Sequence, residues 1–426
     1  MKHISNISLF RAFRSRNYAL YFTGRSVSQF GTWMQRTAVI WVIYTITHSA
    51  FMIGVTIFAE QFPSFLFSML GGIAADRYDK FRIIKIAQIA SMIQAVLLAA
   101  LVVTGHMQVW AILALSVALG VINAFDVPAR QSLIHQVIAD EADLPNALSL
   151  TTAMASLAQL LGPALSGIVL NAFGASVCFI VNAASFGGVI ISLLLMKRTA
   201  NEVKLSDKKM AAEFTEGFVY IRNTPRIGTL ILMLTVVSLL VLPYNTVLPV
   251  FAKVIFKGDA STFGYITSFI GAGAVLCTIF IASRKAAADL RRILWGSLVL
   301  LAVGLVGFSL ARNFGLAMLF ASITGFGAMA QFTICNIVVQ SETSPHIRGR
   351  VIGILIMAIV GVMPVGSLLV GAVSQRIGAP VTVLCQGIIA LVIAISFFRI
   401  LTTHTKKITA SPLANEEEEV LIERVG

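Results

Sequence analysis

Long apolar runs separated by short polar segments dominate the chain. Residues 86–103 and 351–373 are two such runs that contain no charged side chain. A helix needs about 18 or more apolar residues to cross a hydrocarbon core ~30 Å thick. The strands of a membrane β-barrel would alternate polar and apolar residues, whereas these runs are apolar on every side. The pattern therefore predicts an all-α integral membrane protein.

Twelve runs are long enough to be transmembrane helices. The predicted spans are 19–47, 51–75, 83–103, 108–125, 148–170, 175–196, 227–252, 262–282, 293–311, 314–338, 351–373 and 379–398. The longest polar stretch divides them six and six, which gives five parts: a segment 1–18, a half 19–196, a loop 197–226, a half 227–398 and a tail 399–426. Within the loop, Ala211–Ile221 is compatible with a short interfacial helix or with a solvated linker.

The two halves share a glycine pattern. At an offset of 204 residues, three glycines of span 5 and its following turn recur in span 11 and its following turn: Gly162, Gly167 and Gly174 match Gly366, Gly371 and Gly378. Many transporters consist of repeated halves around a central site. We therefore expect two pseudo-symmetric six-helix halves.

Composition agrees with a membrane protein and orients it. Only 12% of residues are charged, against about a quarter in soluble domains. The net charge of +13 does not indicate a nucleic-acid binder, because the basic residues lie in short clusters between the spans. Of the 32 Lys and Arg residues, 26 lie on one side of the predicted membrane and four on the other. The positive-inside rule then places both termini in the cytoplasm.

The segment between spans 2 and 3 carries a specific motif. It reads Gly71-Gly72-Ile73-Ala74-Ala75-Asp76-Arg77-Tyr78-Asp79-Lys80-Phe81-Arg82. This resembles the signature loop of the major facilitator superfamily, with Gly72, Asp76, Arg77, Lys80 and Arg82 in the motif positions. The usual second glycine is replaced by Asp79, a departure shared with the subgroup that contains the bacterial enterobactin (siderophore) exporter.

Other segments resemble the same subgroup. They are residues 28–35 in span 1, residues 123–131 after span 4, Asn146-Ala147 and residues 348–351 before span 11. From the acid-then-base order of the loop, we expect Asp76 to lie against the start of span 11 near Arg350. We also expect Asp126 to pair with Arg77 or a neighbouring basic residue. Such pairs would latch the halves together in the outward-facing state.

Span 5 resembles the antiporter motif of the drug exporters in this superfamily, with Gly162, Pro163 and Gly167 in place. A purely structural kink is the alternative interpretation, because proline removes a backbone hydrogen bond and small residues admit a neighbouring helix. Span 4 as predicted contains no arginine, so the basic motif that such exporters carry there is missing, and their proton handling cannot simply be transferred.

Span 1 contains a polar stripe. Arg25, Gln29 and Arg36 lie on one helix face with Thr32 between them, and Trp33 flanks the stripe. Ionisable residues are costly in hydrocarbon and are expected to face a cavity or one another. Glu60 in span 2 lies at a depth similar to that of Arg36. The two could form a fixed pair that cements the helices, a proton site, or an arginine that releases Glu60 to bind an anionic substrate.

Further polar candidates lie in the second half. Tyr244 and Asn245 follow Pro243, where a bend could present them to the cavity, and Gln331 and Asn336 interrupt span 10. Each could contact substrate or serve as an interhelical hydrogen-bond partner. No histidine or cysteine pair has metal-ligand spacing on one helix, and no phosphate-binding loop or nucleophile elbow occurs. We expect no metal, no cofactor and no enzymatic activity.

The sequence thus predicts a transporter of the bacterial cytoplasmic (inner) membrane that works by alternating access. The expected activity is export of a siderophore or an amphipathic drug in antiport with protons. Its partners are then the small-molecule substrate, protons and the lipid bilayer, with no nucleic acid, and we expect a monomer. The alternatives are an importer and a lipid or lysolipid flippase of the same fold.

Overall fold

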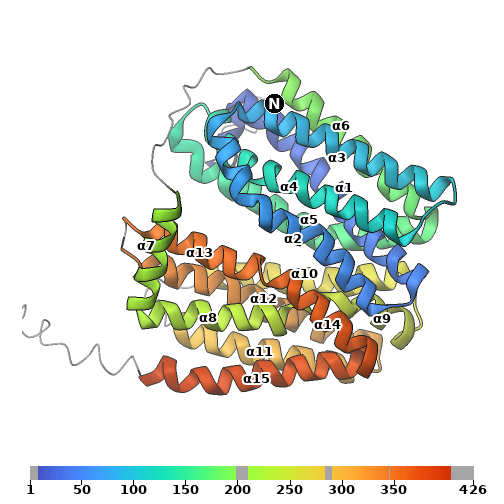
Figure 1. Cartoon of the computed structure of the whole chain (residues 1–426), viewed down its shortest axis with the longest axis vertical. Helices are drawn as coiled ribbons and strands as arrows, with labels where there is room; N and C mark the ends of the chain where they lie inside the picture. The colour runs from blue at the N-terminus through green and yellow to red at the C-terminus, as the bar shows by residue number, and fades with distance from the viewer. Residues whose placement is uncertain (1–7, 198–209, 284–289, 345, 404–426) are drawn as a thin grey trace, which may run out of the picture.

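A computed structural model describes residues 8–197, 210–283, 290–344 and 346–403, and these residues contain helices and turns but no strand (Figure 1). The longer helices are α1 (Arg16–Thr47), α2 (Ala50–Arg77), α3 (Lys80–Val103), α4 (Val109–Val137), α5 (Leu144–Phe173), α6 (Ala175–Leu195), α7 (Met210–Asn223), α8 (Pro225–Leu240), α10 (Ala260–Ala282), α11 (Leu290–Leu310), α12 (Phe314–Glu342), α13 (Arg348–Val360), α14 (Met363–Ile377) and α15 (Ala379–Thr403). Short turns of helix are η2 (Ser8–Arg14), η3 (Glu141–Asp143), η4 (Leu242–Val247), α9 (Leu248–Val250) and η5 (Phe251–Ile255).

Eleven helical segments of the described residues are long and apolar enough to cross a membrane. Two of them are interrupted helices, one running from α8 through η5 and the other from α13 through α14. The outer surface suits hydrocarbon, because large apolar side chains such as Ile86, Leu276 and Ile395 are exposed on it. Helix α1 has 32 residues and is not one of the eleven; it carries the polar stripe.

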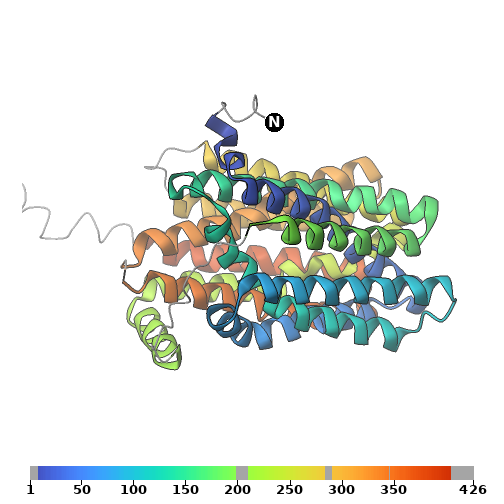
Figure 2. The same ribbon diagram turned by 90° about the horizontal axis from the view of Figure 1, so that it is seen from above.

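The helices form two bundles that lie one above the other in Figure 1 and one behind the other in Figure 2. Helices α1–α6 pack with one another as the N-terminal bundle, and α8–α15 form the C-terminal bundle. Helix α7 packs on α13 and α8, at the left of Figure 1. We call this the α7 end. The far end is the opposite one, where the turns that follow α1, α3, α5 and α14 lie.

Local sequence accounts for many helix ends. Ser49 begins α2 by accepting a hydrogen bond from the Met52 amide, and Asp259 forms a reciprocal capping box with Thr262 at the start of α10. At the far end, α5 and α14 both stop at a glycine with positive φ, +82° at Gly174 and +86° at Gly378. Residues with a side chain rarely adopt a positive φ, which explains why glycine occupies both matched positions.

Helix α4 is longer than the sequence indicated. Its predicted end was residue 125, but the helix continues through Pro128 to Val137. Asp126 therefore lies inside a helix and not in a loop, and Arg130 belongs to the same helix. Elsewhere, the bend predicted at Pro243 is present as a short tight turn with non-helical backbone angles. The break between α13 and α14 was not predicted.

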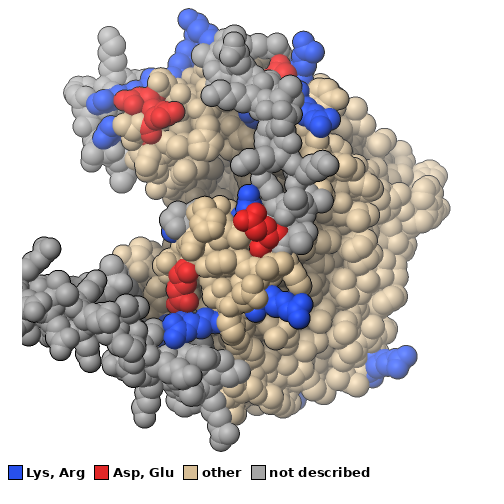
Figure 3. Space-filling model, turned by 60° about the vertical axis from the view of Figure 1, so that its left-hand side comes forward, with Lys and Arg blue, Asp and Glu red and all other residues tan. Residues whose placement is uncertain are grey.

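The two bundles contact each other from mid-helix to the far end. Helix α5 meets α10 where Gly167 and Gly264 face each other, and α2 meets α14 where Gly54 faces the backbone of Ser367. Beyond them, Gln375 accepts hydrogen bonds from the Ser49 hydroxyl (3.0 Å) and the Ala50 amide (3.1 Å). Toward the α7 end the surface is hollowed between the bundles, and charged side chains gather around the opening (Figure 3).

A matched pair of glycine substitutions tests this interface. A Cβ at Gly264 would lie 3.1 Å from Gly167 Cα and would clash with the carbonyl oxygen of Pro163. Both are backbone atoms of α5, so the bundles would have to separate. We expect Gly264→Ala to destabilise the protein by about 1–3 kcal/mol. Gly188→Ala should not destabilise it, because nothing lies within 4 Å of that Cβ position. Thermal denaturation of purified protein gives the comparison, and equal effects would contradict the interface.

Candidate functional site

The N-terminal bundle encloses a polar cavity, which we call the inner cavity. Its volume of about 70 Å³ has room for about five water molecules at ~10–15 Å³ each. It is lined by Arg25, Thr32, Gln35, Arg36, Val39, Glu60, Gln88, Ser91, Gln94, Ser116, Leu119, Asn123, Asp126, Arg130, Asn182 and Phe186. Drug-sized ligands occupy about 300–1,000 Å³. The inner cavity can therefore hold water, an ion or one group of a larger molecule.

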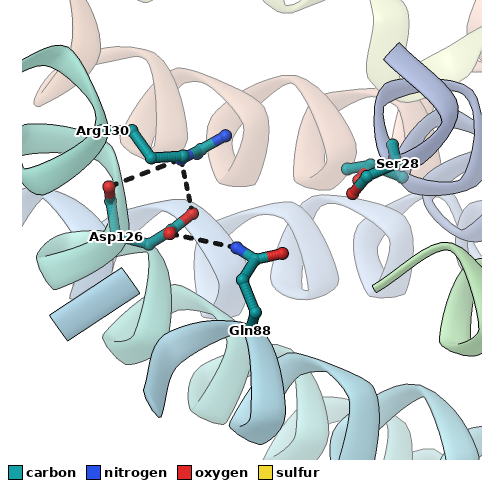
Figure 4. A network of polar contacts seen from close by, with 5 residues as sticks. Ser28, Gln88, Asp126 and Arg130 are labelled. Atoms are coloured by element: carbon teal, nitrogen blue, oxygen red, sulfur yellow. Dashed lines mark hydrogen bonds and ion pairs between the residues drawn. The ribbon is translucent and has the colours of Figure 1, made fainter. Parts of the chain in front are cut away.

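A buried ion pair forms the wall of the inner cavity on α4. Arg130 Nε lies 2.8 Å from Asp126 Oδ2, and the Asp126 side chain is only 5% exposed. Gln88 of α3 donates a hydrogen bond to the other carboxylate oxygen at 3.1 Å. Figure 4 shows both side chains pointing at Asp126, with Ser28 apart from them. Asp126 thus has two partners, and its expected basic neighbour is Arg130, one turn along the same helix, and not Arg77.

A chain of buried amides joins three helices beside this pair. Asn182 of α6 donates to Gln35 of α1 at 2.8 Å, and Gln35 donates to Gln94 of α3 at 2.9 Å. Gln94 in turn donates to the Leu115 carbonyl of α4. Polar groups inside a bundle are stabilised when they are hydrogen-bonded. These residues therefore hold the N-terminal bundle together.

The charged residues of the predicted path behave differently. Arg25 and Arg36 of α1 and Glu60 of α2 all line the inner cavity, and Gln29 lines the outer cavity beside it. Among the described residues, none of the three forms an ion pair or a side-chain hydrogen bond, so Arg36 and Glu60 are not joined. The Arg36 guanidinium lies 5.8 Å from the centre of the Trp33 ring. The structure brings these groups to one cavity without pairing them.

Arg25 is shared with a second space, which we call the outer cavity. This space lies between α1 and α5 and measures about 90 Å³. Its lining comprises Tyr21, Phe22, Arg25, Ser26, Gln29, Thr151, Met154 and Ala155. Arg25 is the one charged residue in that lining.

The candidates of the C-terminal bundle line neither the inner nor the outer cavity. Gln331 is fully buried and donates to the Ser297 hydroxyl at 2.7 Å and to the Leu294 carbonyl at 3.1 Å. Asn336 accepts from Gln340 on its own helix. Tyr244 is buried in the core and Asn245 is exposed beside the turn at Pro243. Gln331 therefore has the geometry of an interhelical partner.

The signature loop is arranged around a helix start. Asp79, the departure from the usual glycine, caps α3 by accepting from the Phe81 amide at 2.9 Å. Lys80 is the first residue of α3, and Arg82 lies 3.7 Å from Asp79. The close helix contact is made by Gly71, whose Cβ position meets the Ala124 carbonyl of α4, while Gly72 has open space.

The expected latch is not formed in this state of the molecule. Asp76 and Arg77 are exposed at the α7 end. Arg350, at the start of α13, forms an ion pair with Glu216 of α7. Because the bundles are apart at this end, the contact of Asp76 with span 11 stays a prediction for the state that closes there.

The antiporter-like motif makes close contacts on two sides of α5. At Gly162 a Cβ would lie 2.6 Å from Trp33 Cβ of α1. Gly167 faces α10 of the other bundle, where a Cβ would lie 2.6 Å from the Ala260 carbonyl oxygen. Pro163 lies between them on the same helix. The motif therefore lets α5 approach both the polar stripe and the opposite bundle.

Sequence reasoning missed the polar residues that the bundle buries. Gln35, Gln88, Gln94 and Asn182 looked like isolated amides in apolar runs, and only their packing joins them. Arg130 was passed over because it fell outside the predicted span 4. Its spacing of four residues from Asp126 was the signal that could have placed the pair on one helix face.

Comparison with known proteins supplies the family. The family model described as transmembrane secretion effector matches residues 7–425. The staphyloferrin A transporter of Staphylococcus aureus is 24% identical over 386 residues, which cover 89% of this chain and 95% of that protein. The multidrug efflux pump Tap of Mycolicibacterium fortuitum is 21% identical and covers 83% of this chain and 88% of its own.

Solved structures show the same fold. The crystal structure of the nucleoside transporter NupG superposes with a TM-score of 0.70 at 16% identity. The match covers 90% of this chain and 98% of that one. At this identity the likeness concerns the fold alone.

Two glutamines of α1 provide a test of which polar residues are structural. Gln35→Leu removes the acceptor of the Asn182 amide and the donor to the Gln94 carbonyl oxygen, and we expect it to destabilise the protein by about 1–2 kcal/mol. Gln29→Leu is the same change on the same helix, at a side chain with no hydrogen bond among the described residues, and should not destabilise. Thermal unfolding of the two purified variants gives the comparison. Equal losses would mean that Gln35 does not hold the bundle.

Proposed function

The chain belongs to the transmembrane secretion effector family of the major facilitator superfamily, and from this premise we propose that it exports a small organic molecule in exchange for protons. Members of this kind are multi-pass membrane transporters and not enzymes. The observation that carries the proposal is the arrangement around α1. Unpaired charged residues line a cavity in one of two bundles that pack together only from mid-helix to the far end.

The proposed topology has twelve spans in two six-helix halves. Helix α1 supplies the twelfth span, since 32 residues extend about 48 Å at ~1.5 Å per residue. The paired contacts of Gly167 with α10 and of Gly371 with α2 support a two-fold relation between the halves. The excess of basic residues on one side supports a location of the α7 end and both termini in the cytoplasm of a bacterial cell. In that orientation the described state opens to the cytoplasm.

Alternating access follows from this geometry. The bundles rock about their contact so that the far end opens while the α7 end closes. Closure would bring Asp76 toward the start of α13, where Arg350 now holds Glu216 of α7. Arg350 would then pair with Glu216 while the α7 end is open and with Asp76 when that end is closed, so each state has its own ion pair.

The names of two relatives and the volumes of the two cavities support the proposed substrate. One relative is named for staphyloferrin A, and another is a multidrug efflux pump. A siderophore or an amphipathic drug is therefore the proposed cargo. Neither cavity is large enough for such a molecule, so most of it would lie in the hollow between the bundles. The alternatives for the same fold are an importer, which moves its substrate in the opposite direction, and a lipid flippase, which moves a different substrate.

Glu60 is the proposed proton carrier. It lines the inner cavity without a partner, and Arg36 lines the same cavity. When Arg36 approaches, the carboxylate is favoured; when it withdraws, burial favours the protonated form. A change of this kind between the two states is what coupling requires.

Transport in everted membrane vesicles tests both direction and coupling. With an acidic interior, wild-type protein should accumulate a siderophore or dye severalfold above vesicles that lack it, and collapse of the pH gradient should remove the gain. Glu60→Gln should lose the stimulation by the gradient and keep substrate exchange, because the amide binds no proton. Exposed Glu141→Gln is the matched control and should behave as wild type. If Glu60→Gln still accumulates substrate at the wild-type level, Glu60 is structural.

A cross-link tests the rocking motion. Ser49 and Gln375 are hydrogen-bonded across the far end, so Ser49→Cys and Gln375→Cys joined by a short bifunctional thiol reagent should hold that end closed. The background needs Cys385→Ser, since Cys385 is exposed whereas Cys178, Cys277 and Cys335 are buried. We expect net transport to fall at least tenfold and to recover when a cleavable reagent is reduced. Undiminished transport by fully cross-linked protein would contradict alternating access.

A further inference from the structure

Arg25 lies where the inner and outer cavities meet. It is nine residues into α1, about 14 Å along the helix at ~1.5 Å per residue. A guanidinium has five N–H donors, and within the described residues none of them has a hydrogen-bond acceptor or an anionic partner. An arginine at this depth is costly unless something compensates it.

The surrounding charges do not compensate Arg25. Asp126 is engaged with Arg130 at 2.8 Å, so its charge is already paired. Glu60 lines the inner cavity but not the outer one. The charged groups around the inner cavity are three arginines and two carboxylates, and the outer cavity adds no acid. One positive charge is therefore left without a counter-charge.

The lining of the outer cavity is suited to bind an anion beside Arg25. The rings of Tyr21 and Phe22 and the side chain of Met154 provide apolar surface in its lining. Gln29, one turn beyond Arg25 on the same face, has an amide with no other hydrogen bond among the described residues. The hydroxyls of Ser26 and Thr151 already donate to backbone carbonyls of their own helices. Arg25, Gln29 and the hydroxyl of Tyr21 are thus the available donors.

We infer that the exported molecule carries an anionic oxygen group, a carboxylate or a phosphate, and that Arg25 binds it at the junction of the two cavities. The planar fork of the guanidinium matches two oxygens of such a group, and Gln29 donates a further hydrogen bond. With about 90 Å³ available, the outer cavity takes this group, and the rest of the molecule extends into the hollow between the bundles. This inference rests on the proposed function.

The test measures binding to purified protein in lipid nanodiscs, with no gradient and no transport. The probes are benzoate, phenyl phosphate and benzamide, which share an aromatic ring and differ in charge. We expect benzoate or phenyl phosphate to bind about 10- to 100-fold more tightly than benzamide, since charge-assisted hydrogen bonds are the stronger ones. The stronger of the two anions tells whether carboxylate or phosphate is preferred. Equal binding of all three by the wild type overturns the inference.

Variants locate the site. Arg25→Gln should abolish the preference for the anions, Arg25→Lys should keep part of it because the charge remains without the fork, and Gln29→Leu should weaken anion binding about threefold to tenfold. Arg312→Gln, in the far-end turn before α12, is the matched control and should leave the preference unchanged. An unchanged preference in Arg25→Gln overturns the assignment of the site. If Arg25→Gln fails to fold, Arg25→Lys and Gln29→Leu decide in the same way.

This measurement is independent of the export assay. A protein that prefers the anionic probes but shows no gradient-driven accumulation would leave the anion site correct and the proposed export wrong. A protein that exports its substrate and binds benzamide as well as benzoate would leave the export correct and the anion site wrong.

Discussion

A hydrocarbon layer offers no hydrogen-bond partners, so each polar side chain inside the helix bundles must find one within the protein or face a water-filled space. This constraint sorts the polar residues of the chain into two groups. Gln35, Gln94 and Asn182 satisfy one another across three helices, and Gln331 does the same between α12 and α11. Arg25, Arg36 and Glu60 find no partner and line a cavity instead. The second group is the part of the molecule available to bind something that comes and goes.

The same constraint shapes the contact between the bundles. In lipid no hydrophobic effect drives helices together, so close van der Waals packing must stabilise their contact. Small residues permit that close packing. Gly167 and Gly264 bring α5 and α10 together, while Gly54 brings α2 against α14. Backbone contacts of this kind cover a limited length of each helix and leave the α7 end open. The bundles can therefore turn about a narrow seam while each keeps its own core, because the amide links of Gln35, Gln94 and Asn182 lie within one bundle, and the Gln375 amide joins the two bundles at the far end.

Residues of the family motifs have identifiable structural roles in this fold. Asp79 departs from the family's glycine but serves as the cap of α3, so the departure keeps the helix start intact. Gly162 and Gly167 place α5 against the polar stripe on one side and the opposite bundle on the other. Helix α5 therefore both contacts the opposite bundle and lines the outer cavity. Arg350 adds an ion pair to Glu216 that ties α7 to the start of α13 in the open state.

The sequence by itself determined the membrane helices, the family and the polar stripe of α1, because hydropathy and helical spacing are local properties of the chain. It also indicated that Arg36 and Glu60 lie at similar depths, since their depths follow from their distances to the span ends. Only the tertiary structure decided which polar residues are paired. For Asp126 the sequence left open Arg77 or a neighbouring basic residue, and the continuation of α4 through Pro128 supplies Arg130 one turn away. For Gln331 it left open a substrate contact or an interhelical hydrogen bond, and the partners on α11 show the hydrogen bonds. Pairing depends on which helices become neighbours and how they are rotated, and no window along the chain contains that information.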